Sequence, residues 1–276
     1  SNKRFISLSD LHYGVLQQLF YKGYMKKLFE YIIKSNYGKK VDAIIIPGDL
    51  IFWINKYQDK YFIKALKRDL EKLAFTLQAP VFVSYGNHDL PFKEESLSEE
   101  EKKEWELANY IENRNQGTFV LNNEQYKIDN VVITGFSPTR DAYNPNAMPD
   151  KAIEIAKESF DKCNFRFNKE NINILLSHDN KFFTHRNITQ NYNELYNDLT
   201  LIIGGHLHDG YIPIWLQRMF SDELKDYGIW EKFPPKIDMC RGAFKVSQGG
   251  PSKVILPNEE KSTTILLNED ETASIV

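Results

Sequence analysis

The sequence predicts an α/β fold, because short apolar runs typical of strands alternate with segments of helical periodicity along the chain. The alternation implies crossover connections and a largely parallel arrangement of the strands. In open α/β sheets, ligands collect beyond the carboxyl ends of such strands. A length of 276 residues fits one large α/β domain, so we expect a single domain over residues 1–276.

Three apolar runs predict the first strands, at residues 5–9, 43–46 and 81–84. Each run leads into a turn that contains a glycine. Between the strands, apolar side chains recur at helical spacing from Leu16 to Ile32 and again from Phe62 to Leu77. The first part of the chain therefore predicts strand, turn and helix in repeated order.

The middle of the chain combines a charged helix with a stretch of hairpins. Residues 93–114 are rich in glutamate and lysine around Trp105, and we expect one solvated helix there. Asn122-Asn123 and Asp129-Asn130 are turn signals. They separate three short strands, which we expect at residues 118–121, 125–128 and 131–134.

The last part of the chain predicts further strands and one aromatic segment. After a loop at residues 137–149 and a helix at 151–161, strands are expected at residues 172–176, 201–203, 243–247, 253–256 and 263–267. Residues 211–235 are rich in aromatic and large aliphatic side chains. This segment is expected to form either an apolar lid beside the site or part of the packed edge of the fold.

The composition excludes several classes of protein. A net charge of -3 disfavours nucleic acid as a partner, because no domain-wide basic field exists. The chain has two cysteines, Cys163 and Cys240, in no CxxC pair, which argues against a disulfide scaffold and a thiolate zinc site. The chain contains no run of about 18 apolar residues, so no membrane span is predicted. We expect a cytoplasmic or a peripheral membrane location.

Side chains that bind metals gather in the turns at the strand ends. Five of the six histidines lie there, whereas His185 matches no such turn and is assigned to the surface or to packing. Residues two apart in an extended chain project to the same side, so closely spaced pairs can hold one ion. The candidate ligands are Asp10, His12, Asp49, Asn87, His178, His206 and His208.

Seven ligands are more than one tetrahedral site needs, which favours two adjacent ions with Asp49 as a bridge. Imidazole and hard oxygen without thiolate suit Mn, Fe or Zn. Two ions about 3.5–4 Å apart would hold a bridging hydroxide for the hydrolysis of a phosphoester. His88 would contact the phosphate or protonate the leaving alkoxide, and Asp89 is a further catalytic candidate that could orient it.

Five blocks resemble those of the calcineurin-like metallophosphoesterase superfamily, in the family's order: Asp10-Leu11-His12, Gly48-Asp49, Gly86-Asn87-His88-Asp89, Ser177-His178 and Gly205-His206-Leu207-His208. The resemblance implies a four-layer αββα sandwich of two mixed sheets, with a binuclear metal site at the strand ends. It also implies two ligand sets. One set consists of Asp10, His12, Asp49 and His208. The other consists of Asp49, Asn87, His178 and His206. His88 matches the family's phosphate-contacting acid.

One motif of this chain differs from that of the protein phosphatases, and this difference narrows the choice of subfamily. Protein phosphatases of this superfamily carry Gly-Asp-x-Val-Asp-Arg-Gly, whereas residues 48–52 read Gly-Asp-Leu-Ile-Phe. The chain looks more like the small bacterial phosphohydrolases, which implies a small or lipid-like phosphoester as substrate, either a monoester or a diester. Two alternatives remain open: a nuclease of the same superfamily, and a non-catalytic scaffold that binds protein partners.

Overall fold

The computed structural model describes residues 3–14, 24–52, 60–91, 96–143, 149–184, 193–205, 242–247, 250–255, 262–267 and 273–275. The chain forms two compact units, each built around one sheet. The first unit comprises residues 1–121 and 258–276, and the second comprises residues 122–257.

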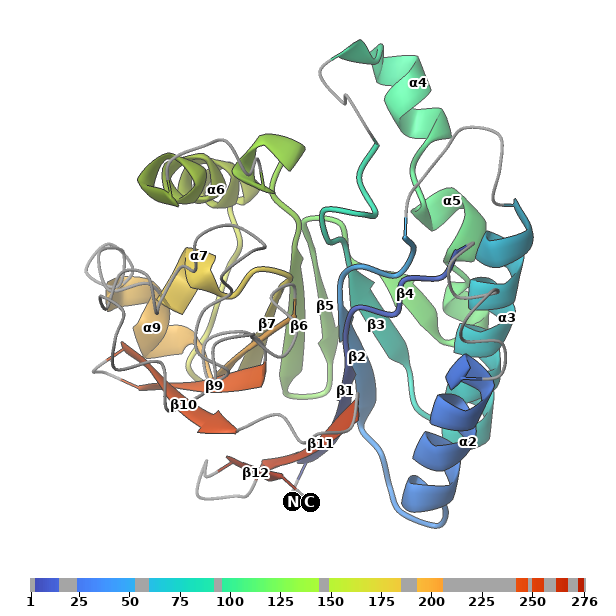
Figure 1. Cartoon of the computed structure of the whole chain (residues 1–276). Coiled ribbons are helices and arrows are strands. Elements are labelled where there is room, and N and C mark those ends of the chain that lie inside the picture. Colours follow the sequence, from blue (N-terminus) through green and yellow to red (C-terminus); the bar gives the residue numbers. More distant parts are fainter. Residues whose placement is uncertain are drawn as a thin grey trace, which may run out of the picture. The chain divides into compact units, whose positions relative to one another are not determined.

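The first unit contains a six-stranded mixed sheet in the order β12-β11-β1-β2-β3-β4 (Figure 1). Its strands are β1 (Lys3–Leu8), β2 (Ala43–Pro47), β3 (Val81–Ser84), β4 (Thr118–Val120), β11 (Ser262–Leu267) and β12 (Ala273–Ile275). Strands β1 to β4 are parallel, and β11 pairs antiparallel with β1. The carboxyl ends of β1, β2 and β3 therefore meet at one edge of this sheet.

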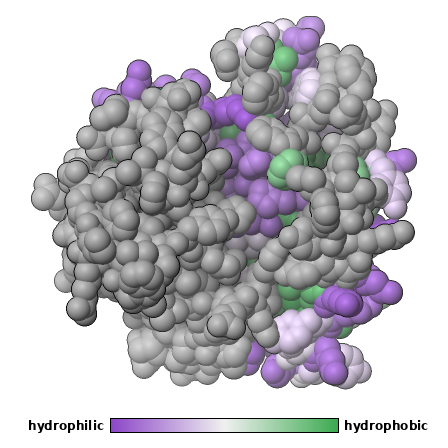
Figure 2. All heavy atoms as spheres, in the orientation of Figure 1, coloured by the Kyte–Doolittle hydropathy of each residue, from purple (hydrophilic) through white to green (hydrophobic). Residues whose placement is uncertain are grey.

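Helices α2 (Tyr24–Asn36), α3 (Lys60–Leu77) and α5 (Ala108–Ile111) lie beside this sheet in Figure 1. Helices α2 and α3 form because apolar residues recur every three or four positions and can be buried together. In α3 the buried stripe consists of Leu66, Leu70 and Leu73, all without solvent exposure. The opposite face of α2 carries charged side chains, and hydrophilic residues lie among paler and hydrophobic ones at the lower right of Figure 2.

The expected single helix at residues 93–114 is wrong, because the chain forms short helices instead. Helix α4 (Glu99–Glu104) begins at a capping box formed by Ser98 and Glu101, and α5 follows after an interruption. The interruption has a tertiary cause. The Tyr85 hydroxyl donates to the side chain of Glu106 (2.6 Å) and accepts from the main-chain N–H of Ala108 (2.8 Å), an N–H that a continuous helix would bond within itself.

The second unit contains the other six-stranded mixed sheet, in the order β10-β9-β8-β7-β6-β5. Its strands are β5 (Glu124–Ile128), β6 (Val131–Phe136), β7 (Ile172–Ser177), β8 (Leu201–Gly204), β9 (Gly242–Ser247) and β10 (Gly250–Ile255). Strands β6, β7 and β8 are parallel. Helices α6 (Pro149–Cys163), α7 (Lys181–Thr184) and α9 (Asn193–Asp198) lie beside this sheet in Figure 1.

The expected hairpins are only partly confirmed. Strands β5 and β6 form an antiparallel hairpin through Asp129-Asn130, as the turn signal predicts. Strand β4, in contrast, pairs parallel with β3 in the first sheet. Asn122-Asn123 therefore marks the passage of the chain from one unit to the other. There the Asn123 amide exchanges two hydrogen bonds with the main chain of Ser137, at 2.8 and 2.9 Å.

The predicted α/β class with two mixed sheets and flanking helices is confirmed. The single domain over residues 1–276 stays a prediction, as does the αββα stacking. The segment 211–235 lies outside the described residues. None of the helices that the structure describes is long and apolar enough to cross a membrane.

Candidate metal centre

The turns that follow β1 and β2 run side by side. Three main-chain N–H groups of the first turn donate to carbonyls of the second: Asp10 to Gly48 (3.3 Å), His12 to Asp49 (2.9 Å) and Tyr13 to Leu50 (2.9 Å). These bonds continue the parallel pairing of β1 with β2 beyond the strand ends. They place the two predicted ligands of the first turn next to the predicted bridging carboxylate of the second.

Three of these residues have a left-handed backbone conformation although none is glycine. The φ angles are 56° at Asp10, 48° at His12 and 54° at Asp49. Such a conformation costs about 1–3 kcal/mol for each non-glycine residue, and it persists where surrounding bonds enforce it. Aspartate and histidine tolerate it better than most residues. The interlocked turns thus hold three candidate ligands in a conformation that the free chain would rarely adopt.

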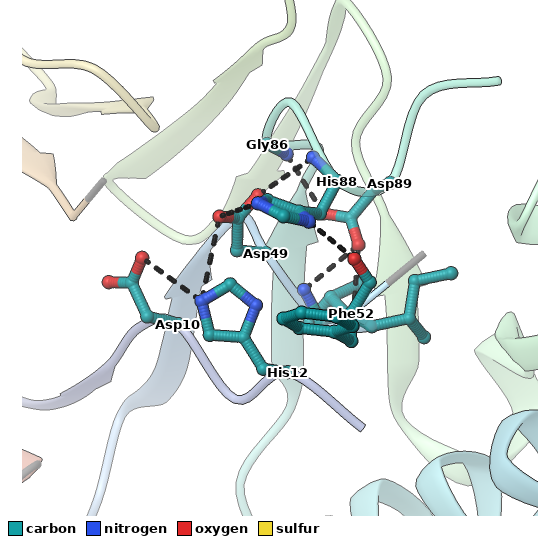
Figure 3. Close-up of polar contacts among 9 residues, drawn as sticks. Asp10, His12, Asp49, Phe52, Gly86, His88 and Asp89 are labelled. Atoms are coloured by element: carbon teal, nitrogen blue, oxygen red, sulfur yellow. Dashed lines mark hydrogen bonds and ion pairs between the residues drawn. The ribbon is translucent and has the colours of Figure 1, made fainter. Parts of the chain in front are cut away.

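The side chains of both histidines in this region face the carboxylate of Asp49 (Figure 3). The Nε2 atom of His12 lies 3.8 Å from Asp49 Oδ2, and the Nε2 atom of His88 lies 4.0 Å from the same oxygen. A second carboxylate oxygen, Asp10 Oδ1, lies 4.0 Å from His12 Nε2. The side chains of Asp49 and Asp10 are only 2% and 6% exposed, whereas those of His12 and His88 remain partly open to solvent.

This arrangement fits a metal ion. Ligand atoms of His12, Asp49 and His88 all lie within 4.8 Å of one another. Two ligands of one ion, each bound at about 2.0–2.2 Å, are at most roughly 4.4 Å apart. The separations of 3.8 and 4.0 Å are too long for hydrogen bonds but fall within that limit. Imidazole and carboxylate without thiolate is also the donor set that Mn, Fe or Zn accepts.

His88 is held by a hydrogen bond of its main chain and by two contacts of its ring. Its main-chain N–H donates to Asp49 Oδ1 at 3.0 Å, and its Nδ1 contacts the main-chain carbonyl of Phe52. Because a carbonyl oxygen only accepts, Nδ1 carries a hydrogen, and Nε2 is the nitrogen that faces Asp49. The Phe52 ring stacks on the imidazole at 5.6 Å between centroids. These contacts determine which nitrogen of His88 is presented to the site.

Asp89 is almost completely buried, and its carboxylate is directed at main-chain N–H groups. One oxygen accepts from Leu50 (2.9 Å) and Ile51 (3.1 Å), and the other accepts from Gly86 (2.8 Å). This geometry gives the side chain a role in holding two turns together. A catalytic role for Asp89 stays a prediction that none of these contacts supports.

Tyr13 anchors the first turn to helix α3, and sequence reasoning missed it. Its hydroxyl donates to Asp69 at 2.9 Å. Burial, with a smaller contribution from the Asp69 carboxylate, raises the pKa of the Tyr13 hydroxyl well above its usual range. Phe52 was missed as well. The only sequence signal for either residue is its position, directly after His12 or within the block that begins at Gly48.

His178 lies in the second unit, where it follows β7 and is fully buried. Its main-chain carbonyl accepts from the N–H of Gly205 at 2.9 Å, so the turn after β7 is bonded to the end of the neighbouring parallel strand β8. Gly204 packs tightly against the same turn. A Cβ atom there would lie only 2.8 Å from the carbonyl oxygen of Ser177.

The remaining predicted site residues are only partly described. Asn87 lies in the turn after β3, between Gly86 and His88. His206 and His208 lie outside the described residues. The structure thus brings Asp10, His12, Asp49 and His88 together within the first unit and places His178 at a strand end of the second.

An α/β fold that gathers imidazole and carboxylate groups at the ends of parallel strands defines a candidate metalloenzyme. The family model of the calcineurin-like phosphoesterases matches residues 3–210. The chain belongs to the calcineurin-like phosphoesterase family, and it is a metallophosphoesterase, a hydrolase that acts on phosphoric esters.

A search of curated protein sequences gave no match. Among solved structures, a phosphopantetheinyl hydrolase from Mycobacterium tuberculosis is similar over 80% of this chain and 86% of its own. The two sequences are 12% identical, and the TM-score is 0.42. A likeness at this level carries no inference about the substrate.

Proposed function

We propose that this protein hydrolyses a small or lipid-like phosphomonoester or phosphodiester at two metal ions, with His88 as the acid that protonates the leaving group. The observation that carries the proposal is the convergence of His12 and His88 on the one buried carboxylate of Asp49. Family membership supports the reaction class. The lipid-like substrate depends on residues 211–235, which lie outside the described residues, so it stays a prediction.

The ligand sets implied by the family motifs are Asp10, His12, Asp49 and His208 for one ion, and Asp49, Asn87, His178 and His206 for the other. Bound Mn, Fe or Zn would supply Lewis acidity and an activated water. Asp49 belongs to both sets, and its burial suits this position because a carboxylate held away from water interacts more strongly with a cation.

His88 can act as an acid because of how its ring is held. The carbonyl of Phe52 accepts a hydrogen bond from Nδ1–H, which leaves Nε2 to carry or release the second proton. His88 is partly exposed, so a phosphate oxygen or a leaving alkoxide can approach it. A positioned acid of this kind contributes about 10²–10⁴-fold to a rate.

Two variants test the proposal. In Asp49→Asn we expect loss of both bound metal and turnover, because one oxygen of the central carboxylate becomes an amide donor. In His88→Ala we expect wild-type metal content and a rate lower by about 10²–10⁴-fold. Metal analysis and hydrolysis of chromogenic monoesters and diesters measure both effects.

His185→Ala is the matched control, since His185 belongs to no motif block and should leave both measurements unchanged. Loss of metal in His88→Ala would show that His88 is a ligand, as its place beside His12 and Asp49 also permits. A metal-free, inert wild type would reject the proposal and favour a protein-binding scaffold.

A further inference from the structure

The carboxylate of Asp89 connects two separate segments of the first unit. One oxygen accepts from the main-chain N–H groups of Leu50 and Ile51, and the other accepts from the N–H of Gly86, three residues before Asp89 (Figure 3). The first segment directly follows Asp49, and the second is the turn that contains His88. Asp89 itself is 1% exposed, so water competes little for these bonds.

The two segments that Asp89 connects also make the contacts that assemble the site. The His88 N–H donates to Asp49 Oδ1, and the His88 ring donates to the Phe52 carbonyl. Both contacts join the same two segments as the Asp89 bonds, because His88 belongs to one segment and residues 49–52 belong to the other. If the segments moved apart, Asp49 and His88 would lose their mutual orientation together.

We infer that Asp89 is a positioning residue, which sets the placement of Asp49 and His88 through the main chain of both turns and does not itself transfer a proton. The effect of Asp89 on turnover rests on the proposed function, whereas its effect on the placement of Asp49 does not. The inference can therefore be measured as metal affinity as well as rate.

Asp89→Asn changes the bonding with almost no change in shape. An asparagine has one carbonyl oxygen and one NH₂ group, and the NH₂ group cannot accept. If the oxygen keeps Leu50 and Ile51, two donors face each other at Gly86. If the side chain flips, both other N–H groups lose their acceptor. In either orientation at least one buried N–H is left without this partner.

The expected result for Asp89→Asn is a 10–100-fold lower Mn²⁺ affinity, the usual effect of changing a residue that supports metal ligands. The rate at saturating Mn²⁺ should fall by a similar factor, because a misplacement of about 1 Å can cost 10²-fold. The pH dependence of kcat should keep its shape, since the substitution removes no group that transfers a proton in the reaction. Calorimetric Mn²⁺ titration and steady-state kinetics, at a temperature where the variant is folded, measure these quantities.

Asp42→Asn is the matched control. Asp42 also accepts a main-chain N–H, that of Arg4 at 2.7 Å, and lies near the ammonium groups of Lys3 and Lys40. It supports the opposite end of β1 from the site, so its loss should lower the melting temperature without changing Mn²⁺ affinity. If both substitutions lowered Mn²⁺ affinity equally, Asp89 would only stabilise the fold in general, and the inference would be rejected.

Wild-type protein provides a test that does not depend on the folding of a variant. The amide hydrogens of Leu50, Ile51 and Gly86 should exchange slowly with solvent in NMR spectra, because all three are bonded to a buried carboxylate. Exchange at the rate of an exposed amide would contradict the inference. A wild type that hydrolyses no phosphoester, with Mn²⁺ affinity still reduced in Asp89→Asn, would reject the proposed function and leave the inference standing.

Discussion

Gly204 at the end of β8 offers a sharp test of how the second unit holds His178. A Cβ atom at this position would lie 2.8 Å from Asn180 Cβ and 2.8 Å from the Ser177 carbonyl oxygen. Carbon contacts are comfortable from about 3.5 Å, so alanine would be roughly 0.7 Å too close. Ser177 and Asn180 flank His178, and the turn that carries this histidine must therefore move in Gly204→Ala.

The expected magnitude follows from this crowding. Overpacking by one methyl group lowers the free energy of unfolding by about 1–3 kcal/mol. Replacing glycine also restricts the unfolded chain, which raises the free energy of unfolding by about 0.4–1 kcal/mol. A net loss of about 1–2 kcal/mol corresponds to a melting temperature lower by roughly 2–4 °C for a chain of 276 residues. A shift of His178 below 1 Å should lower turnover by about 10-fold, somewhat less than the 10²-fold expected for a full ångström.

Differential scanning calorimetry and kinetics on a chromogenic phosphoester measure the two effects. Gly38→Ala is the control, because Gly38 has a φ of 72° but no atom within 4 Å of an added Cβ. The Gly38→Ala variant should lose stability through backbone strain alone and keep full activity. If Gly204→Ala were as stable and as active as the wild type, the tight packing of β8 against the His178 turn would be refuted.

Two further predictions concern buried tyrosines. Tyr13→Phe removes the hydrogen bond to the Asp69 carboxylate and should cost about 1.5–3 kcal/mol in the free energy of unfolding, measured by urea denaturation; an unchanged midpoint would contradict this. Burial raises the pKa of the hydroxyls of Tyr13, Tyr85 and Tyr196. The folded state therefore favours their neutral forms, and the stabilisation present below the ordinary tyrosine pKa of about 10 is lost as the pH rises above it. An ultraviolet titration should show these three ionising only as the protein unfolds in alkali, whereas full ionisation of a folded protein near pH 10 would be the contrary result.

The strand ends of the first unit could be predicted from the sequence, because the signal is local. A short apolar run followed by Asp10 and His12, or by Gly48 and Asp49, specifies both a buried strand and a polar turn at its end. Helix α3 was likewise predictable, since Leu66, Leu70 and Leu73 recur at helical spacing and are fully buried. The convergence of Asp10, His12, Asp49 and His88 then follows from parallel neighbouring strands.

Contacts between distant segments required the tertiary structure. Strand β11 pairs antiparallel with β1 although some 250 residues separate them, and β4 joins the sheet of β3 instead of the hairpin that follows it. The interruption between α4 and α5 depends on the hydroxyl of Tyr85, and the bonds of Asp89 depend on N–H groups of Leu50 and Ile51. Local sequence is enough to show which side chains can bind a metal and which strand ends carry them. How these side chains are held depends on the three-dimensional fold, because main-chain hydrogen bonds between distant segments leave no mark in local composition or periodicity.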